Sequence, residues 1–278
     1  MKDYTKTLPE HMERYIGEND LFLEIYKGIK RNGTTNKRPP LLFVHGAYTG
    51  SWMWSKYIPH FVNGGWNCYV MNMRGHYRSR VMDLTKVYFE DYLEDIEEVI
   101  KEIIRELGER PIVFGFSMGG ILCQKTAENI PLAGLVLIDS SISREVYNKI
   151  PYESTENVKL EIIVPAPERN EEYSMDESAE DIIFQKKYLA AESTHAFLAS
   201  SFLFGAKDGI SIDRNLIKTP CLVIKAINSE EEDRRGQAEA LHLRGEYLGL
   251  YKTTHTGLLV GQRYNEAVER IMEWLKRF

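Results

Sequence analysis

The chain has few cysteines and no long apolar run. Three of its 278 residues are cysteines, Cys68, Cys123 and Cys221, and each lies within an apolar stretch. An odd number of cysteines in such surroundings predicts reduced core residues and provides no disulfide framework. No apolar stretch approaches the roughly 20 residues that cross a bilayer, and the opening MKDYTKTLPEHMERYIGEND lacks the apolar segment of a signal peptide. These absences predict a cytoplasmic protein with no membrane span.

Sequence patterns for metal, nucleotide and nucleic-acid binding are missing as well. The chain contains no H-E-x-x-H, no C-x-x-C and no G-x-x-x-x-G-K pattern, so we expect neither a metal site nor a bound cofactor. The formal net charge is -6, and no basic stripe runs against it. A nucleic acid is therefore not an expected partner.

What the chain does have is an alternation of buried strands and amphipathic helices. The clearest helix spans Glu90 to Leu107, with its apolar residues on one face and Gly108 at its end. Short, continuous apolar runs are typical of parallel strands that are buried on both faces. Such runs occupy residues 41–44, 67–71, 112–114, 134–138, 220–226 and 247–251. The fold class is therefore α/β, a mostly parallel central sheet flanked by helices, whose ligand site lies at the carboxyl ends of the strands.

Two other regions complete the predicted organisation. Leu21 to Tyr26 forms a strand of a first hairpin, and residues 31–40 form a turn-rich connection. Residues 143–210 interrupt the alternation with an acidic, proline-bearing segment and an aromatic, mainly helical stretch at 182–204. We interpret residues 1–142 and 211–278 as the core, and residues 143–210 as an inserted helical cap over the site.

The pentapeptide Gly115-Phe116-Ser117-Met118-Gly119 lies between an expected strand and an expected helix. Glycines two positions on either side of a serine permit a strained turn that exposes its hydroxyl. The helix that follows points unpaired amides toward the place where negative charge would develop. In an acyl-transfer enzyme, a second amide comes from the loop after an earlier strand, here HGAYTG at 45–50. Ala47 and Met118 are the candidate oxyanion-hole donors, and His45 is expected to hold that loop in place.

Taken together, the order of these parts resembles the α/β-hydrolase fold over nearly the whole chain. The residues that carry the resemblance are H-G-A-Y-T-G at 45–50, R-G-H at 74–76, G-F-S-M-G-G at 115–120 and T-H-T-G at 254–257. The loop at 45–54 is most similar to the branch that contains small-ester esterases and hydroxynitrile lyases. The resemblance implies a catalytic triad of serine, acid and histidine in that chain order.

Within that triad, Ser117 is the expected nucleophile and His255 the expected base. Family members usually carry the acid just after the strand at 221–225, and Glu230 is the choice in the loop expected at 227–233. Glu232 and Asp233 in the same acidic run are alternatives. Asp139 remains a further alternative, because some relatives carry the acid after the earlier strand.

The resemblance implies hydrolysis of a carboxylic ester through an acyl-enzyme on Ser117. An aromatic cap suits a small-molecule ester with an apolar part. Thioesterase, lactonase, C–C hydrolase and hydroxynitrile lyase chemistry would use the same residues. A ligand-binding receptor that has kept the pocket is the alternative from another class.

Overall fold

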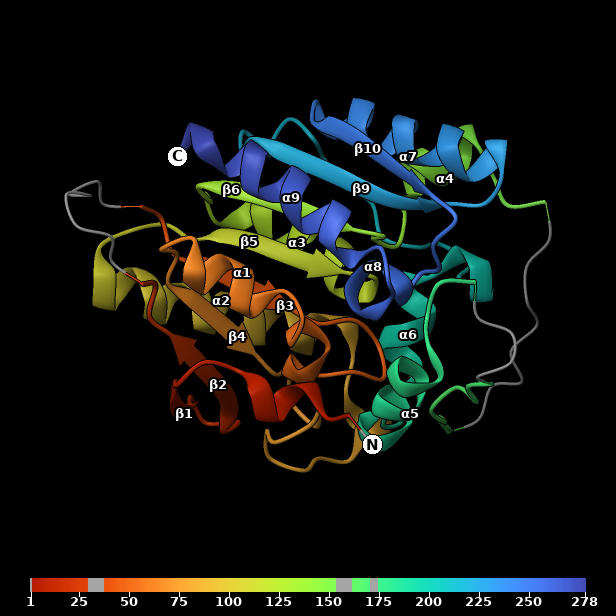
Figure 1. The fold of residues 1–278 in the computed structure, drawn as a ribbon. Coiled ribbons are helices and arrows are strands. Elements are labelled where there is room, and N and C mark those ends of the chain that lie inside the picture. Colours follow the sequence, from red (N-terminus) through yellow and green to blue (C-terminus); the bar gives the residue numbers. More distant parts are fainter. Residues whose placement is uncertain (1, 30–37, 154–161, 171–174) are drawn as a thin grey trace.

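A single twisted sheet forms the framework of the described chain. The computed structural model describes residues 2–29, 38–153, 162–170 and 175–278. Within these ranges the sheet has eight strands in the order β1-β2-β4-β3-β5-β6-β9-β10 (Figure 1). The strands are β1 Met12–Ile16, β2 Leu21–Tyr26, β3 Leu41–Val44, β4 Cys68–Met71, β5 Ile112–Phe116, β6 Gly134–Ile138, β9 Cys221–Ile227 and β10 Glu246–Tyr251.

Pairing in the sheet is parallel except at one edge. β1 and β2 form an antiparallel hairpin, and β2 pairs antiparallel with β4. The pairs from β4 through β3, β5, β6 and β9 to β10 are all parallel. The predictions of a first hairpin and a mostly parallel sheet are confirmed. Most of the connection expected at 31–40 lies outside the described residues.

Helices cover both faces of the sheet. α1 and α9 pack on one face, and α2, α3 and α7 pack on the other (Figure 1). In the described part of the chain no helix is both long enough and apolar enough to cross a bilayer. The α-helices are α1 Ile58–Asn63, α2 Phe89–Leu107, α3 Met118–Asn129, α4 Arg144–Lys149, α5 Ala179–Tyr188, α6 Thr194–Ser200, α7 Glu230–Leu243, α8 Gly257–Val260 and α9 Tyr264–Trp274.

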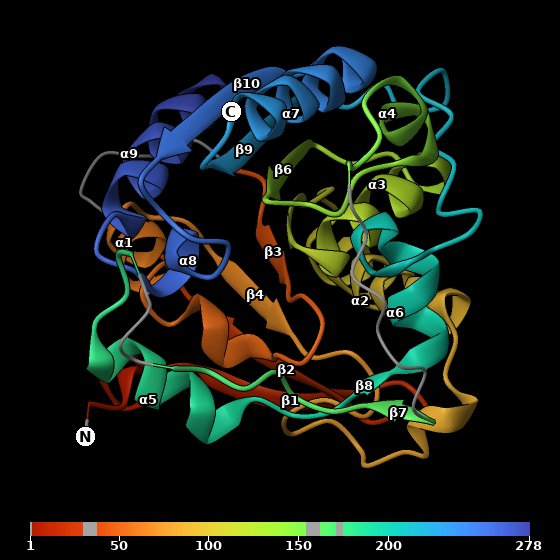
Figure 2. The ribbon, with the colours of Figure 1, turned by 90° about the vertical axis from the view of Figure 1, so that its right-hand side faces the viewer.

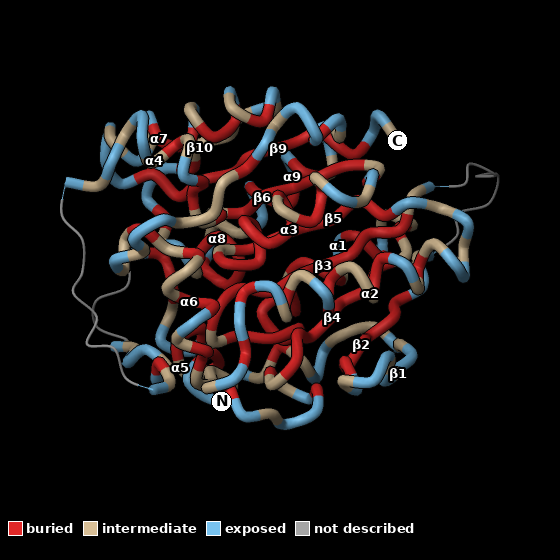
Figure 3. Tube along the Cα trace, turned by 180° about the vertical axis from the view of Figure 1, so that it is seen from behind, coloured by how far each residue is buried: buried red, intermediate tan, exposed pale blue. Residues whose placement is uncertain are grey.

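The central strands are buried on both faces, as Figure 3 shows. On β3, Leu42 and Val44 pack into the core beneath α2 and α3, whereas Leu41 and Phe43 pack into the core beneath α1 and α9. Successive side chains of a strand point to opposite faces, so each residue of such a strand needs an apolar side chain. This is the physical reason for the unbroken apolar runs in the sequence.

One predicted boundary is wrong. The expected loop at 227–233 is in part the first turn of α7, which begins at Glu230. The Ser229 hydroxyl accepts a hydrogen bond from the Glu232 amide (3.1 Å), and the Glu232 carboxylate accepts one from the Asn228 amide (2.7 Å). Such capping starts a helix, and acidic residues in the first turn are stabilised by the helix dipole. The acidic run is therefore a helix N-terminus.

Between β6 and β9 the chain departs from the alternation of strand and helix. The described part of residues 143–210, hereafter the insertion, contains α4, α5 and α6 and the two-stranded pair of β7 (Ile163–Val164) and β8 (Glu192–Ser193). α5 and α6 lie beyond the carboxyl ends of the central strands (Figures 1 and 2). The helical stretch expected at 182–204 is divided by β8, which separates α5 from α6.

Candidate active site

Ser117 occupies a one-residue turn between β5 and α3. Its backbone has φ 55° and ψ -123°, which residues with a side chain rarely adopt. Its amide donates to the Ile138 carbonyl (3.1 Å), and its carbonyl accepts from the amides of Gly120 (2.9 Å) and Ser141 (3.0 Å). These bonds to the end of β6 and the start of α3 hold the strained backbone. The expected strand–serine–helix turn is present and is tighter than expected, because β5 extends to Phe116 and α3 begins at Met118.

Two glycines of the pentapeptide allow this turn to pack against its neighbours. A Cβ atom on Gly115 would lie 2.6 Å from the Gly119 carbonyl oxygen. A Cβ atom on Gly119 would lie 2.3 Å from the His45 carbonyl oxygen. Since real Cβ atoms do not approach backbone this closely, both positions exclude any larger residue. The glycines thus bring the turn against the loop that follows β3.

A chain of hydrogen bonds links Ser117, His255 and a carboxylate. The loop from β10 to α8 places His255 Nε2 3.0 Å from Ser117 Oγ and its Nδ1 2.5 Å from Asp139 Oδ2. The imidazole also stacks on the Phe116 ring, with centroids 4.7 Å apart. Because an ionised carboxylate only accepts hydrogen bonds, Nδ1 carries the proton and Nε2 is free to accept from the Ser117 hydroxyl.

The carboxylate that contacts His255 is Asp139 and not Glu230, which corrects the choice made from the sequence. Glu230 is the first residue of α7, where its charge faces the helix N-terminus. The other two acidic candidates are also engaged elsewhere. Glu232 accepts from a backbone amide within the α7 cap, and Asp233 accepts from the Tyr247 hydroxyl (2.7 Å). Asp139 was the alternative placed after the earlier strand, and the structure brings that residue to the histidine.

The surroundings of Asp139 favour its ionised form. Burial by itself would raise the pKa of this carboxyl, but the hydrogen bond and charge of His255 and the charge of Lys225 hold it below its ordinary value. The Lys225 ammonium donates to the Ser140 carbonyl (2.5 Å) and pairs with Glu239 (2.7 Å). Asp139 is therefore charged at any pH where an imidazole acts as a base.

The amides of Ala47 and Met118 both lie beside the serine turn. A Cβ atom on Gly46 would lie 2.8 Å from the Ser117 Cβ, so the loop after β3 touches the turn directly. Met118 is the first residue of α3, and first-turn amides have no partner within their own helix. Among the hydrogen bonds of the described residues, neither the Ala47 nor the Met118 amide donates to a protein group. Two donors next to Ser117 are thus available to an anion.

His45 fixes the loop that carries Ala47. Its Nδ1 donates to the Gly46 carbonyl (2.8 Å), and its Nε2 accepts from the Met73 amide (3.1 Å). Burial, with the charge of nearby His76, lowers the pKa of His45 to about 3. The ring is therefore neutral and bridges two loops, which is the structural role expected from the sequence.

A buried ion pair joins the loop after β4 to the insertion. His76 Nε2 lies 3.0 Å from Glu192 Oε2, and its Nδ1 lies 3.0 Å from the Arg74 carbonyl. Since both ring nitrogens face acceptors, His76 is an imidazolium. Glu192 also accepts from the Tyr92 hydroxyl (2.6 Å) and the Tyr48 amide (3.2 Å), the latter directly after Ala47. The carboxylate from β8 therefore supports the backbone directly after Ala47.

We expect Glu192→Gln to destabilise the fold by about 3–5 kcal/mol near pH 5.5, because it leaves the His76 charge buried without its partner. Burial opposes both charges, yet the pair raises the pKa of His76 and lowers that of Glu192. The contribution of His76 to the free energy of unfolding is complete below the ordinary imidazole pKa, and it is lost as pH rises through the raised value. The Glu192 contribution is present above the ordinary carboxyl pKa and is lost on acidification. The effect should therefore shrink at pH 9.

Urea unfolding of both proteins at pH 5.5 and pH 9 measures this effect. The control is Glu13→Gln, which removes a pair with Arg78 whose two side chains are each 41% exposed. Exposed pairs contribute about 0–1 kcal/mol. A loss under 1 kcal/mol for Glu192→Gln, or one that does not change with pH, would contradict the assignment of a charged buried pair.

A cavity of about 460 Å³ opens beside the three hydrogen-bonded side chains. Ser117, Asp139 and His255 lie in its wall, and the insertion contributes Tyr152, Phe202 and Phe204. On the α7 side, the wall includes Arg235, whose guanidinium lies 4.2 Å from the centroid of the Tyr152 ring. The wall of the cavity therefore combines three aromatic side chains from the insertion with the serine hydroxyl. Among the described residues, no group of three or more His, Cys, Asp or Glu side chains could hold a metal ion.

Comparison with known proteins agrees with this geometry. The sequence profile described as "alpha/beta hydrolase fold" matches residues 39–196, more than half of the chain. The chain belongs to the α/β-hydrolase fold family. Membership of this family supports hydrolase chemistry. By sequence alone, no curated protein matched the chain.

Several solved structures share the fold. A soluble variant of monoglyceride lipase from Saccharomyces cerevisiae superposes with a TM-score of 0.69 at 13% identity, over 99% of this chain and 97% of that one. A thermophilic esterase from Thermogutta terrifontis gives 0.64 at 16% identity, over 97% and 99% of the two chains. A monoacylglycerol lipase from Paleococcus ferrophilus gives 0.61 at 19% identity, over 92% and 98%. At these identities the likeness shows the α/β-hydrolase fold alone.

Proposed function

We propose that this chain is a serine hydrolase that cleaves carboxylic esters through an acyl-enzyme on Ser117. The observation that carries the proposal is the run of hydrogen bonds from Ser117 Oγ through His255 to Asp139. A serine hydroxyl is too weak an acid to attack a carbonyl near neutral pH, and a hydrogen-bonded imidazole removes this obstacle. Family membership supports the coarser statement that the protein is a hydrolase.

In the proposed first step, Ser117 Oγ attacks the ester carbonyl while His255 Nε2 takes the hydroxyl proton. The Asp139 carboxylate holds the Nδ1–H tautomer and stabilises the imidazolium that forms. His255 then gives the proton to the departing alcohol oxygen, and the acyl group remains on Ser117. His255 must stay within hydrogen-bonding distance of Ser117, because it returns a proton to the Ser117 oxygen in the second step.

The negative charge of the tetrahedral intermediate is assigned to the Ala47 and Met118 amides. Each such donor typically lowers the barrier by about 3 kcal/mol, because it is already oriented when the charge develops. In the second step, water attacks the acyl-enzyme with His255 as the base. The acid is released, and Ser117 regains its proton.

The proposed substrate is a small-molecule ester with an apolar part. Support comes from the aromatic side chains of Tyr152, Phe202 and Phe204, which face the cavity beside Ser117. On this proposal, residues 143–210 act as a cap that supplies apolar contacts. Residues 1–142 and 211–278 then form the catalytic core.

The proposal is tested with a fluorophosphonate probe and a panel of p-nitrophenyl esters of increasing acyl length. The expected result is one equivalent of phosphonate on the peptide that contains Ser117, with loss of ester turnover in proportion to labelling. Thioesters and lactones in the same panel measure how selective the enzyme is for oxygen esters. Absence of both labelling and turnover would refute a serine hydrolase and favour a binding protein.

A further inference from the structure

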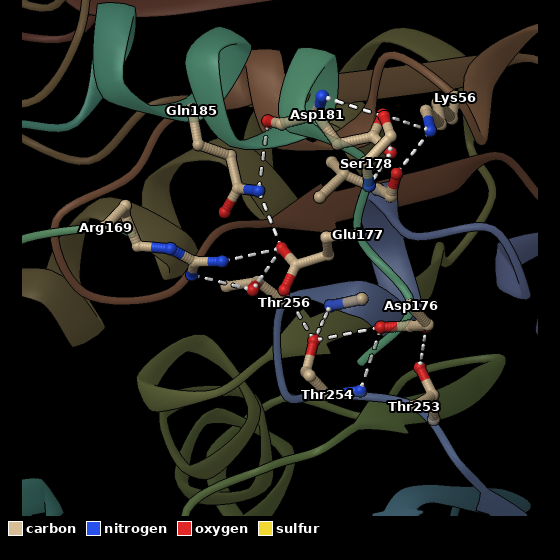
Figure 4. Close-up of polar contacts among 12 residues, drawn as sticks. Lys56, Arg169, Asp176, Glu177, Ser178, Asp181, Gln185, Thr253, Thr254 and Thr256 are labelled. Atoms are coloured by element: carbon tan, nitrogen blue, oxygen red, sulfur yellow. Dashed lines mark hydrogen bonds and ion pairs between the residues drawn. The ribbon is translucent and has the colours of Figure 1, made fainter. Parts of the chain in front are cut away.

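The loop that carries His255 has a threonine at three of its neighbouring positions. Thr253 and Thr254 precede the histidine after β10, and Thr256 follows it before α8. The His255 side chain is 48% exposed, so packing alone does not fix its position. All three threonine hydroxyls point to one place on the insertion, as Figure 4 shows. That place is the dipeptide Asp176-Glu177.

Asp176 binds the two residues that precede His255. Its Oδ2 accepts from the Thr253 hydroxyl (2.5 Å), and its Oδ1 accepts from the Thr254 amide (3.3 Å). Its own carbonyl accepts from the Gln262 amide (2.8 Å), just beyond α8. The carboxylate is buried, with the residue only 6% exposed. One insertion residue thus binds the histidine loop at its start and the chain after it.

Glu177 binds the residues on both sides of His255. Its Oε2 accepts from the Thr254 hydroxyl (2.7 Å), and its Oε1 accepts from the Thr256 hydroxyl (2.7 Å). Gln185 of α5 donates to the same Oε1 (2.7 Å), and Arg169 forms an ion pair with it at 2.8 Å. Burial opposes ionisation, yet the charge of Arg169 and these hydrogen bonds hold the pKa of Glu177 below its ordinary value.

Glycines in the histidine segment leave room for the Asp176 carboxylate. A Cβ atom on Gly257 would lie 2.3 Å from Asp176 Oδ1, and one on Gly261 would lie 2.6 Å from Oδ2. A side chain at Gly257, the final residue of T-H-T-G, would therefore collide with a carboxylate of the insertion. Only a chain without side chains at these two positions can close around the carboxylate.

From this geometry we infer that Asp176 and Glu177 are positioning residues for His255, an inference that rests on the proposed function for its kinetic consequence. Neither residue lines the cavity itself, and both bind the threonines on either side of His255. Catalysis requires the imidazole to keep its place between Asp139 and Ser117 to within a fraction of an ångström. The insertion thus supplies part of the framework of the catalytic centre in addition to its aromatic wall.

Asp176→Asn and Thr253→Val test the inference, because each keeps the shape of the side chain and disrupts the contact between Asp176 and Thr253. The matched control is Asp181→Asn. Asp181 is an equally buried aspartate of the same segment, and accepts from Tyr4 (2.6 Å) and Lys56 (2.7 Å) without touching the histidine loop. Thr253→Ser, which keeps the hydroxyl, is the rescue variant.

With p-nitrophenyl ester as the probe, we expect kcat to fall about ten- to a hundredfold in Asp176→Asn and Thr253→Val with KM nearly unchanged. Thr253→Ser should recover most of the wild-type kcat. Asp181→Asn should keep a kcat within about twofold of the wild-type value, even if its melting temperature falls as much as that of Asp176→Asn. Equal losses of kcat in Asp176→Asn and Asp181→Asn would overturn the inference, since loosening of the insertion would then explain both.

A spectroscopic measurement keeps the test valid if the wild type turns over no ester. The proton between His255 Nδ1 and Asp139 gives a low-field ¹H resonance that reports the histidine position directly. We expect this resonance to shift or broaden in Asp176→Asn and to persist in Asp181→Asn. An unchanged resonance in both would overturn the positioning role, whereas absent turnover with the expected shifts would overturn only the proposed function.

Discussion

Ser117→Ala should lower kcat for p-nitrophenyl esters by on the order of 10⁴- to 10⁶-fold and abolish fluorophosphonate labelling. The variant removes the only oxygen within hydrogen-bonding reach of His255 Nε2 in the described structure. In serine proteases that use the same three residue types, loss of the nucleophile costs about 10⁶ in kcat. Steady-state kinetics at matched concentrations of folded wild type and variant measures the change.

Two controls sharpen this result. Ser55→Ala removes a buried hydroxyl that donates to the Trp52 carbonyl (2.7 Å) away from the cavity, and should leave kcat within about twofold. The double variant Ser117→Ala, His255→Ala should have a kcat at most about threefold below that of Ser117→Ala, because the effects of residues that act as a unit do not add. Substantial turnover by Ser117→Ala, or additive losses in the double variant, would show that another group is the nucleophile.

Asp139→Asn should lower kcat by about 10⁴, while Glu230→Gln should change it by less than about threefold. The amide of an asparagine presents a donor or a neutral acceptor to His255 Nδ1, so the imidazole loses its fixed tautomer and the charge that stabilises its protonated form. Glu230 lies at the start of α7, where loss of its charge costs only about 0.3–1 kcal/mol of stability. The comparison is made by kcat/KM across pH 5 to 9.

The pH dependence gives an independent measurement of the same assignment. The folded state lowers the pKa of Asp139, so its contribution to stability is present above the ordinary aspartate pKa and is lost as pH falls through the lowered value. The free energy of unfolding should therefore fall less steeply on acidification in Asp139→Asn than in the wild type. In Glu230→Gln this acid limb should be as in the wild type. If Glu230→Gln lowered kcat and changed the acid limb while Asp139→Asn did neither, the catalytic acid would instead be Glu230.

Most of the architecture could be predicted because its signals are local. Apolar runs such as 41–44 and 134–138 are continuous since the strands are buried on both faces, and these elements lie where expected. The first turn of α7 was missed although Ser229 and Glu232 form a recognisable cap. The acidic run was interpreted as a source of a catalytic carboxylate, and this obscured its simpler role at a helix N-terminus.

The site was only partly predictable for a different reason. Ser117 is identified by glycines at fixed spacing, and His255 by its place after the last strand. Glu192 and Asp176 have no such signature, because the groups they bind are far away in the sequence. Glu192 reaches a histidine 116 positions earlier, and Asp176 reaches Thr253, 77 positions later. Nothing in the residues around either carboxylate indicates those partners.

By itself the sequence determined the order of strands and helices, the serine at the tip of a strained turn and the candidates for its partners. Tertiary structure decided which carboxylate reaches the imidazole. β6 lies between β5 and β9 in the sheet, so the carboxyl end of β6 is next to the serine turn and Asp139 faces His255 across 116 residues of chain. Local patterns specify where a chain turns, whereas contact between distant side chains depends on how the turns are brought together.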